Sequence, residues 1–76
     1  MVEFSNIQVK DGYIYAIETD LMTGETAKIK LSITKEEYYS DPALTTVPMK
    51  RALWGLQSAV QKHGTKLGNK YTVAWG

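Results

Sequence analysis

The stretch from Val47 to Gly64, VPMKRALWGLQSAVQKHG, constrains the fold most, because it is the one convincing helix of normal length in the chain. Pro48 suits the first helical turn, and Gly64 suits the position just past the end. Thr46 precedes the helix as an expected N-cap. At roughly 100° per residue, one stripe about 120° wide collects Met49, Ala52, Leu53, Leu56, Ala59, Val60 and His63. This stripe predicts the face that packs on the rest of the protein.

Three antiparallel strands are expected before this helix. The loop 10–12 predicts a three-residue hairpin connection in which Val9 pairs with Tyr13, and the next turn, also ending on Gly, pairs Thr19 with Glu25. Both turns select the same buried face, which holds Ile7, Val9, Tyr13, Tyr15, Ile17, Ala27, Ile29, Leu31 and Ile33. The opposite face is expected to hold Gln8, Ile14, Ala16, Glu18, Thr26, Lys28, Lys30 and Ser32.

Two further elements complete the expected order β-β-β-α-α-β. The capping-box pattern at 34–37 predicts a short helix over residues 34–39 that stops before Pro42. Alternation over 70–75 predicts a fourth strand, with one side formed by Tyr71, Val73 and Trp75. The sequence therefore predicts a single α+β domain over residues 1–76, with the main helix on one face of an antiparallel or mixed sheet. The pattern leaves open whether the last strand lies beside the first or the third.

Composition excludes several functional classes. The chain contains no cysteine, so disulfides, thiolate metal ligation and cysteine nucleophiles are unavailable. Its apolar runs are too short for a membrane span or a signal-peptide core, and we expect a cytoplasmic protein. Since 76 residues lie near the lower end of what folds unaided, a partner or self-association would add stability.

Catalytic patterns are weak. His63, the only histidine, is explained by the favourable interaction of positive charge with a helix C-terminus. Glu36 and Glu37 are explained as solvated charge at a helix start. The segment 64–68 lacks the Gly-Lys-Ser/Thr ending of a phosphate loop and follows a helix instead of preceding one. We therefore expect no enzyme, no cofactor and no metal site.

Trp54 is the large aromatic that the expected core does not explain, because it falls on the outer face of the main helix. Residues typical of interfaces surround it, and the predicted partner-binding set is Trp54, Lys50, Arg51, Gln57 and Gln61. The alternative is that Trp54 is covered within the chain, by the loop 40–47 or by Tyr38 and Tyr39. The favoured hypothesis is a small protein-binding module, an adaptor or inhibitor that docks on a protein partner or forms a homodimer. An accessory protein of a phage or mobile element would fit this description.

Nucleic-acid binding is the second hypothesis, because the chain from Lys50 onward contains basic residues and no acidic ones. The expected contacts are Lys28, Lys30, Lys62, Lys66 and Lys70. Such proteins combine basic charge with exposed aromatic rings. The expected register turns most tyrosines inward, so it predicts no stacking surface on the open side of the sheet.

Overall fold

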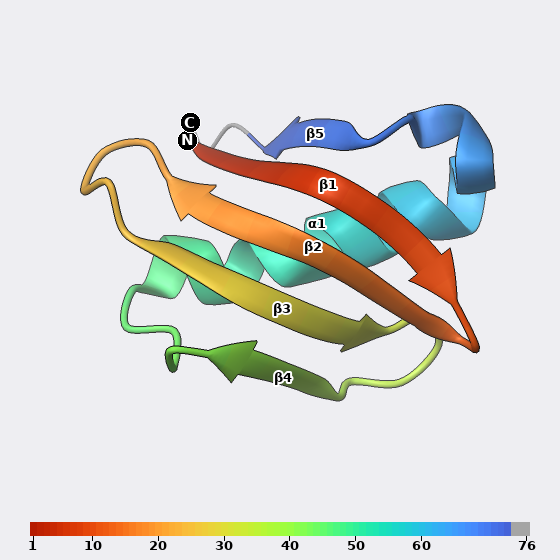
Figure 1. The fold of residues 1–76 in the computed structure, drawn as a ribbon, viewed down its shortest axis with the longest axis horizontal. Coiled ribbons are helices and arrows are strands. Elements are labelled where there is room, and N and C mark those ends of the chain that lie inside the picture. Colours follow the sequence, from red (N-terminus) through yellow and green to blue (C-terminus); the bar gives the residue numbers. More distant parts are fainter. Residues whose placement is uncertain (74–76) are drawn as a thin grey trace.

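A computed structural model describes residues 1–73 and shows one antiparallel sheet with a single α-helix lying across one of its faces (Figure 1). The elements in chain order are β1 (Val2–Lys10), β2 (Tyr13–Asp20), β3 (Thr26–Ser32), β4 (Tyr38–Asp41), α1 (Val47–His63), the 3₁₀ turn η1 (Gly64–Leu67) and β5 (Lys70–Val73). The five strands lie in the order β4-β3-β2-β1-β5. The α+β class is confirmed, but the sheet has one strand more than predicted and there is one α-helix, not two.

The prediction for α1 is confirmed in detail. Thr46 is the N-cap and its side chain accepts a hydrogen bond from the Met49 amide, while Gly64 follows the helix with a positive φ of 56°. The residues that α1 buries are Met49, Ala52, Leu53, Leu56, Ala59 and Val60. His63, predicted at the edge of this stripe, is exposed at the helix end. The apolar stripe therefore sets which side of α1 meets the sheet.

The first hairpin differs from the prediction by one residue. Asp11 and Gly12 have φ values of 54° and 82°, so they form a two-residue turn in which both residues are left-handed. Lys10 therefore pairs with Tyr13, and Val9 pairs with Ile14. The predicted pairing of Val9 with Tyr13 is wrong.

This shift of one residue exchanges the two faces of β2, because side chains alternate along a strand. Ile14, Ala16 and Glu18, predicted on the open side, are buried beneath α1. The predicted core residues Tyr13, Tyr15 and Ile17 lie on the other face. The physical reason is that β2 is apolar on both sides near its start, so hydrophobicity alone does not choose between the two registers.

The second hairpin also shifts by one residue, since Thr19 pairs with Thr26 and not with Glu25. The two shifts compensate, and β3 presents the predicted residues to the core. Buried there are Ala27, Ile29 and Leu31.

A bulge in β1 changes which of its residues face the core. The register shifts between Ser5 and Gln8, and Asn6 has a φ of 52°. Val2 and Phe4 are fully buried before the bulge and Ile7 is buried after it, while Val9 is 43% exposed. The extra residue moves the core face from even to odd positions. Val9, opposite the buried Ile14, lies on this face as well, but it is 43% exposed, so the prediction that it is buried is wrong.

The predicted short helix over 34–39 is also wrong, because this segment turns the chain into strand β4. The Ser32 hydroxyl accepts hydrogen bonds from the amides of Thr34 and Lys35, and the Ser32 amide donates to the Glu37 carbonyl. Tyr38 then pairs with Leu31 in β3. A helix of one or two turns has little intrinsic stability, whereas tyrosine favours a strand.

The last strand pairs with the first, antiparallel, which answers the question that the sequence pattern left open. Val2 pairs with Val73, and Phe4 pairs with Tyr71. The prediction for Trp75 lies outside the described residues. None of the helices in the described part of the chain combines the length and the apolar character needed to cross a bilayer.

Gly55, in the middle of α1, provides a test of how the helix packs against β5. A methyl group at this position would lie 3.4 Å from Val73 Cγ2, which is ordinary van der Waals contact with an edge strand. Alanine is about 1 kcal/mol more favourable than glycine within a helix. We expect Gly55→Ala to stabilise the protein by roughly 0.5–1 kcal/mol, measured by urea unfolding. Gly55→Leu is the matched overpacking variant and should destabilise it; a loss with Gly55→Ala would contradict the expected packing.

Candidate functional site

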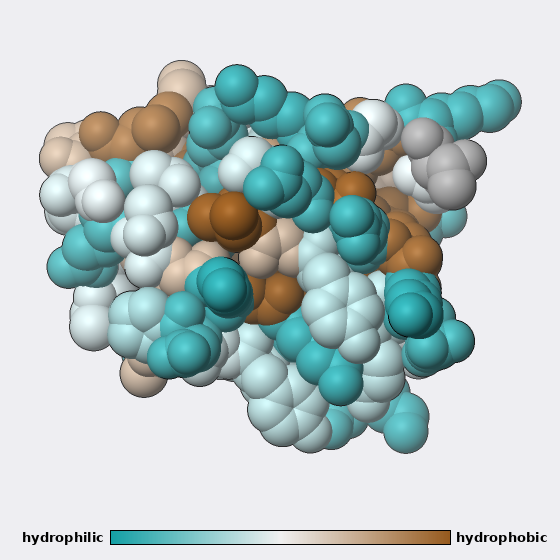
Figure 2. Space-filling model, viewed as in Figure 1, coloured by the Kyte–Doolittle hydropathy of each residue, from teal (hydrophilic) through white to brown (hydrophobic). Residues whose placement is uncertain are grey.

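The open face of the sheet, which is the side turned away from α1, presents three tyrosines around one lysine. Tyr13 and Tyr15 lie on β2, Lys30 on β3 and Tyr39 on β4. Tyr39 pairs with Lys30, and Lys30 pairs with Tyr15, so these three side chains form one row across three strands. Figure 2 looks onto this face and shows pale rings with hydrophilic side chains among them. We call Tyr13, Tyr15, Tyr39 and Lys30 the tyrosine platform.

The Lys30 ammonium lies at the centre of the tyrosine platform. Its Nζ atom is 4.4 Å from the ring centroid of Tyr13 and 5.8 Å from the centroids of both Tyr15 and Tyr39. All three distances fall within the range of cation–π attraction. Tyr39 and Tyr15 remain 54% and 36% exposed, so this contact leaves aromatic surface available to a ligand.

Charge of both signs surrounds the tyrosine platform. Register places Lys28 opposite Asp41 on β4, and Lys70 Nζ lies 3.5 Å from Glu3 Oε2. The Tyr39 hydroxyl donates a 2.8 Å hydrogen bond to Glu37, and this bond raises the pKa of Tyr39. The open face therefore carries charges of both signs, and Lys30 takes part in no ion pair within residues 1–73.

The five lysines predicted to contact nucleic acid divide into two groups. Lys28, Lys30 and Lys70 share the open face, but Lys28 and Lys30 lie on β3, whereas Lys70 lies three strands away on the edge strand β5. Lys62 lies on α1 and Lys66 on η1, away from that row. The structure thus places two of the predicted contacts at the tyrosine platform, a third at the far edge of the same face and two elsewhere.

Trp54, the centre of the predicted partner-binding set, is half-buried against Tyr38. The two ring centroids are 6.2 Å apart with an interplanar angle of 77°, an edge-to-face contact. Lys50 and Arg51 are exposed in the first turns of α1. Of the two alternatives drawn from the sequence, these contacts favour the one in which Tyr38 covers the indole within the chain.

The two glutamines of that set are engaged in contacts within the chain. Gln57 Nε2 donates to the carbonyls of Ser32 and Lys35, at 2.7 and 2.9 Å. Gln61 Nε2 donates to the carbonyl of Ile33. These bonds hold the turn between β3 and β4 against α1, and therefore cover part of the outer helix face.

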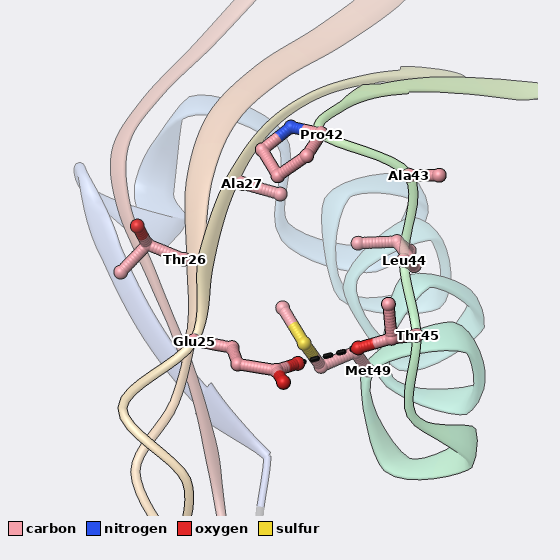
Figure 3. Close-up of a pocket in the computed structure, with 8 residues that line it drawn as sticks. All are labelled: Glu25, Thr26, Ala27, Pro42, Ala43, Leu44, Thr45 and Met49. Carbon is pink, nitrogen blue, oxygen red and sulfur yellow. Dashed lines mark hydrogen bonds between the residues drawn. The ribbon is translucent and has the colours of Figure 1, made fainter.

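A pocket of about 330 Å³ lies between β3 and the segment that leads into α1 (Figure 3). Its walls are mainly apolar, with Ala27 facing Leu44 and Met49. At one end the Glu25 carboxylate accepts a hydrogen bond from the Thr45 hydroxyl. The Glu25 carboxylate is already hydrogen-bonded to Thr45, and the other walls are mainly apolar. The pocket therefore presents few polar groups to a ligand.

Two acidic residues lie under α1 on the core face of β2. Asp20 is well paired, because its carboxylate accepts hydrogen bonds from the Met22 amide and the Thr46 hydroxyl. Glu18 is fully buried, and neither of its carboxyl oxygens has a hydrogen-bond partner. Burial, reinforced by the nearby charge of Asp20, raises the pKa of Glu18 to about 8. Glu18 is therefore protonated in the folded protein at neutral pH.

The described residues hold no group of three or more His, Asp or Glu side chains placed to bind a metal ion. No protein-family model, curated protein or solved structure matches this chain. Among the surfaces described above, the tyrosine platform is the one that combines exposed aromatic rings with a free positive charge.

Sequence reasoning missed the tyrosine platform because it took the first loop as three residues. The dipeptide Asp11-Gly12 between apolar strands is itself the strongest short signal for a two-residue turn. Applied alone, it pairs Lys10 with Tyr13 and turns the tyrosines of β2 outward. The sequence therefore contained a signal for the two-residue turn that exposes these tyrosines.

Gln57→Ala tests whether the turn between β3 and β4 depends on α1. The substitution removes two hydrogen bonds and leaves two carbonyls without those donors, so we expect a loss of about 1–2 kcal/mol of unfolding free energy. Ser58→Ala, at an exposed neighbouring position, is the matched control and should change stability little. Equal urea midpoints for the two variants would show that the glutamine does not hold the turn.

Glu18→Gln tests the buried carboxyl. The pKa of Glu18 in the folded protein lies above its ordinary value of 4.5, so the folded protein binds a proton that the unfolded chain releases, and stability falls as pH rises from 4.5 to about 8. The expected slope is up to about 1.4 kcal/mol per pH unit. Glu18→Gln should be more stable than wild type at pH 7 and should converge with it toward pH 4.5. Parallel pH profiles of unfolding would contradict the assignment.

Proposed function

We propose that this protein is a non-catalytic nucleic-acid-binding protein and that it binds through the open face of the sheet. The observation that supports this proposal is the tyrosine platform, in which Lys30 lies between three tyrosine rings. Aromatic rings supply stacking surfaces for bases, and lysines supply contacts to phosphates. Both requirements meet on one face.

The surrounding lysines favour a polyanion over a neutral ligand. Lys28 and Lys70 share the open face with Lys30, and each also lies near one carboxylate. A phosphate chain that crosses this face would therefore meet positive charge along the strands. Since Asp41 and Glu3 offset part of that charge, we expect modest affinity that is highest at low salt.

The proposal differs from the protein-docking hypothesis in where the ligand binds. Trp54 packs against Tyr38, and Gln57 is hydrogen-bonded to the turn between β3 and β4. A partner on the outer helix face would find Lys50 and Arg51 accessible but little of the expected apolar anchor. If the following test finds no nucleic-acid binding, docking of a protein on that face is the competing hypothesis.

Lys30→Gln tests the proposal by removing the central charge. Binding of labelled mixed-sequence DNA and RNA would be measured by fluorescence anisotropy, beginning at about 50 mM salt. We expect weaker binding and a salt slope that is shallower by about 0.7–0.9, the value of one lost phosphate contact. Lys62→Gln, an exposed lysine on α1, is the control and should bind as the wild type does.

Two results would overturn the proposal. One is the absence of binding by the wild type at low salt to DNA and RNA alike. The other is binding that falls with Lys62→Gln but not with Lys30→Gln, which would place the contact on the helix side.

A further inference from the structure

The rings of the tyrosine platform are spaced widely enough to receive separate bases. Tyr15 and Tyr39 lie on either side of Lys30, two strands apart, which corresponds to about 10 Å across a sheet. Tyr13 and Tyr15 lie two residues apart on one strand, about 7 Å. One ring therefore does not block a planar ligand from reaching the next.

Stacking on the tyrosine platform requires a base whose ring face is accessible. In a duplex the base faces are stacked on one another, and proteins reach the base edges by inserting a helix or a two-stranded ribbon into a groove. The platform lies within a five-stranded sheet, which is too broad to enter a groove. Its tyrosines would meet only the backbone of a duplex.

The helix side of the protein is poorly suited to a groove as well. The turn between β3 and β4 is hydrogen-bonded to Gln57 and Gln61, so it covers one side of the second half of α1, while Ser58 and Lys62 stay exposed. The opposite side of α1 is buried on the sheet. The helix is thus enclosed on two sides.

The distribution of charge on the open face also argues against binding of a duplex. Lys28 faces Asp41 across the strand pair, and Lys70 is paired with Glu3. This leaves few unopposed lysines for phosphates, whereas duplex binding without base readout depends on many such contacts. Stacking must therefore supply much of the affinity.

We infer that the ligand is a single strand, DNA or RNA, whose unpaired bases stack on Tyr15 and Tyr39 while its phosphates pass Lys28 and Lys30. This inference rests on the proposed function and specifies its ligand. Because two or three phosphates at most are neutralised, we expect a salt slope of roughly −2, far shallower than that of a duplex-binding protein.

The test compares a labelled oligonucleotide, as single-stranded DNA and as single-stranded RNA, with the same sequence in a duplex. We expect the wild type to bind at least one of the single strands about tenfold more tightly than the duplex. Tyr39→Ala and Tyr15→Ala should each weaken single-strand binding by about tenfold, within the range of one lost base stack. Tyr15→Phe retains the ring and should bind as the wild type does.

Folding of each variant is checked by thermal melting, and Tyr39→Ala, at an exposed position on an edge strand, decides the matter if Tyr15→Ala unfolds. Equal affinity for single strand and duplex, with binding still weakened in Lys30→Gln, would overturn the inference and leave the proposed function standing. The absence of binding to single-stranded DNA, to single-stranded RNA and to the duplex would overturn both the inference and the proposed function. Unchanged binding by a folded Tyr39→Ala would overturn the stacking arrangement alone.

Discussion

The two left-handed residues Asp11 and Gly12 determine what each face of this sheet carries. Because both have positive φ, the turn contains two residues, and every side chain of β2 is assigned to one side of the sheet as a consequence. Ile14 and Ala16 meet the apolar stripe of α1, and Tyr13 and Tyr15 are left on the open face. The hydrophobic core and the tyrosine platform are therefore two results of the same turn.

The same register also accounts for the buried acids. Once Ile14 faces α1, alternation carries Glu18 and Asp20 to that side as well. Asp20 is compensated because it links the β2–β3 turn to the N-cap of α1 through the Met22 amide and the Thr46 hydroxyl. Glu18 has no such partner and is kept neutral instead, as its pKa of about 8 indicates. Strand β2 thus passes from an apolar half to a polar half under one helix.

How far the sequence could be interpreted depended on how many independent signals each element carried. Helix α1 had a cap, a proline, a glycine and a clear stripe, and its buried residues are those predicted. Strand β2 was apolar on both sides at Tyr13 and Ile14, so its faces depended on the turn alone. The predicted register was wrong by one residue in each of the two hairpins. Because the two errors compensated in β3, the wrong buried face of β2 was consistent with the correct buried face of β3. The strand at Tyr38 depended on long-range pairing with Leu31 and on support from Gln57, and neither is visible in a local pattern.

The position of Lys30 has a consequence for solubility. An exposed group of tyrosines on a sheet is the kind of surface through which copies of a protein adhere to one another. When two such faces approach, their central ammonium groups meet across a closing, water-poor gap, where like charges repel strongly. An arriving polyanion meets attraction at the same point. The charge of Lys30 therefore opposes contact between two aromatic faces and favours contact with a polyanion.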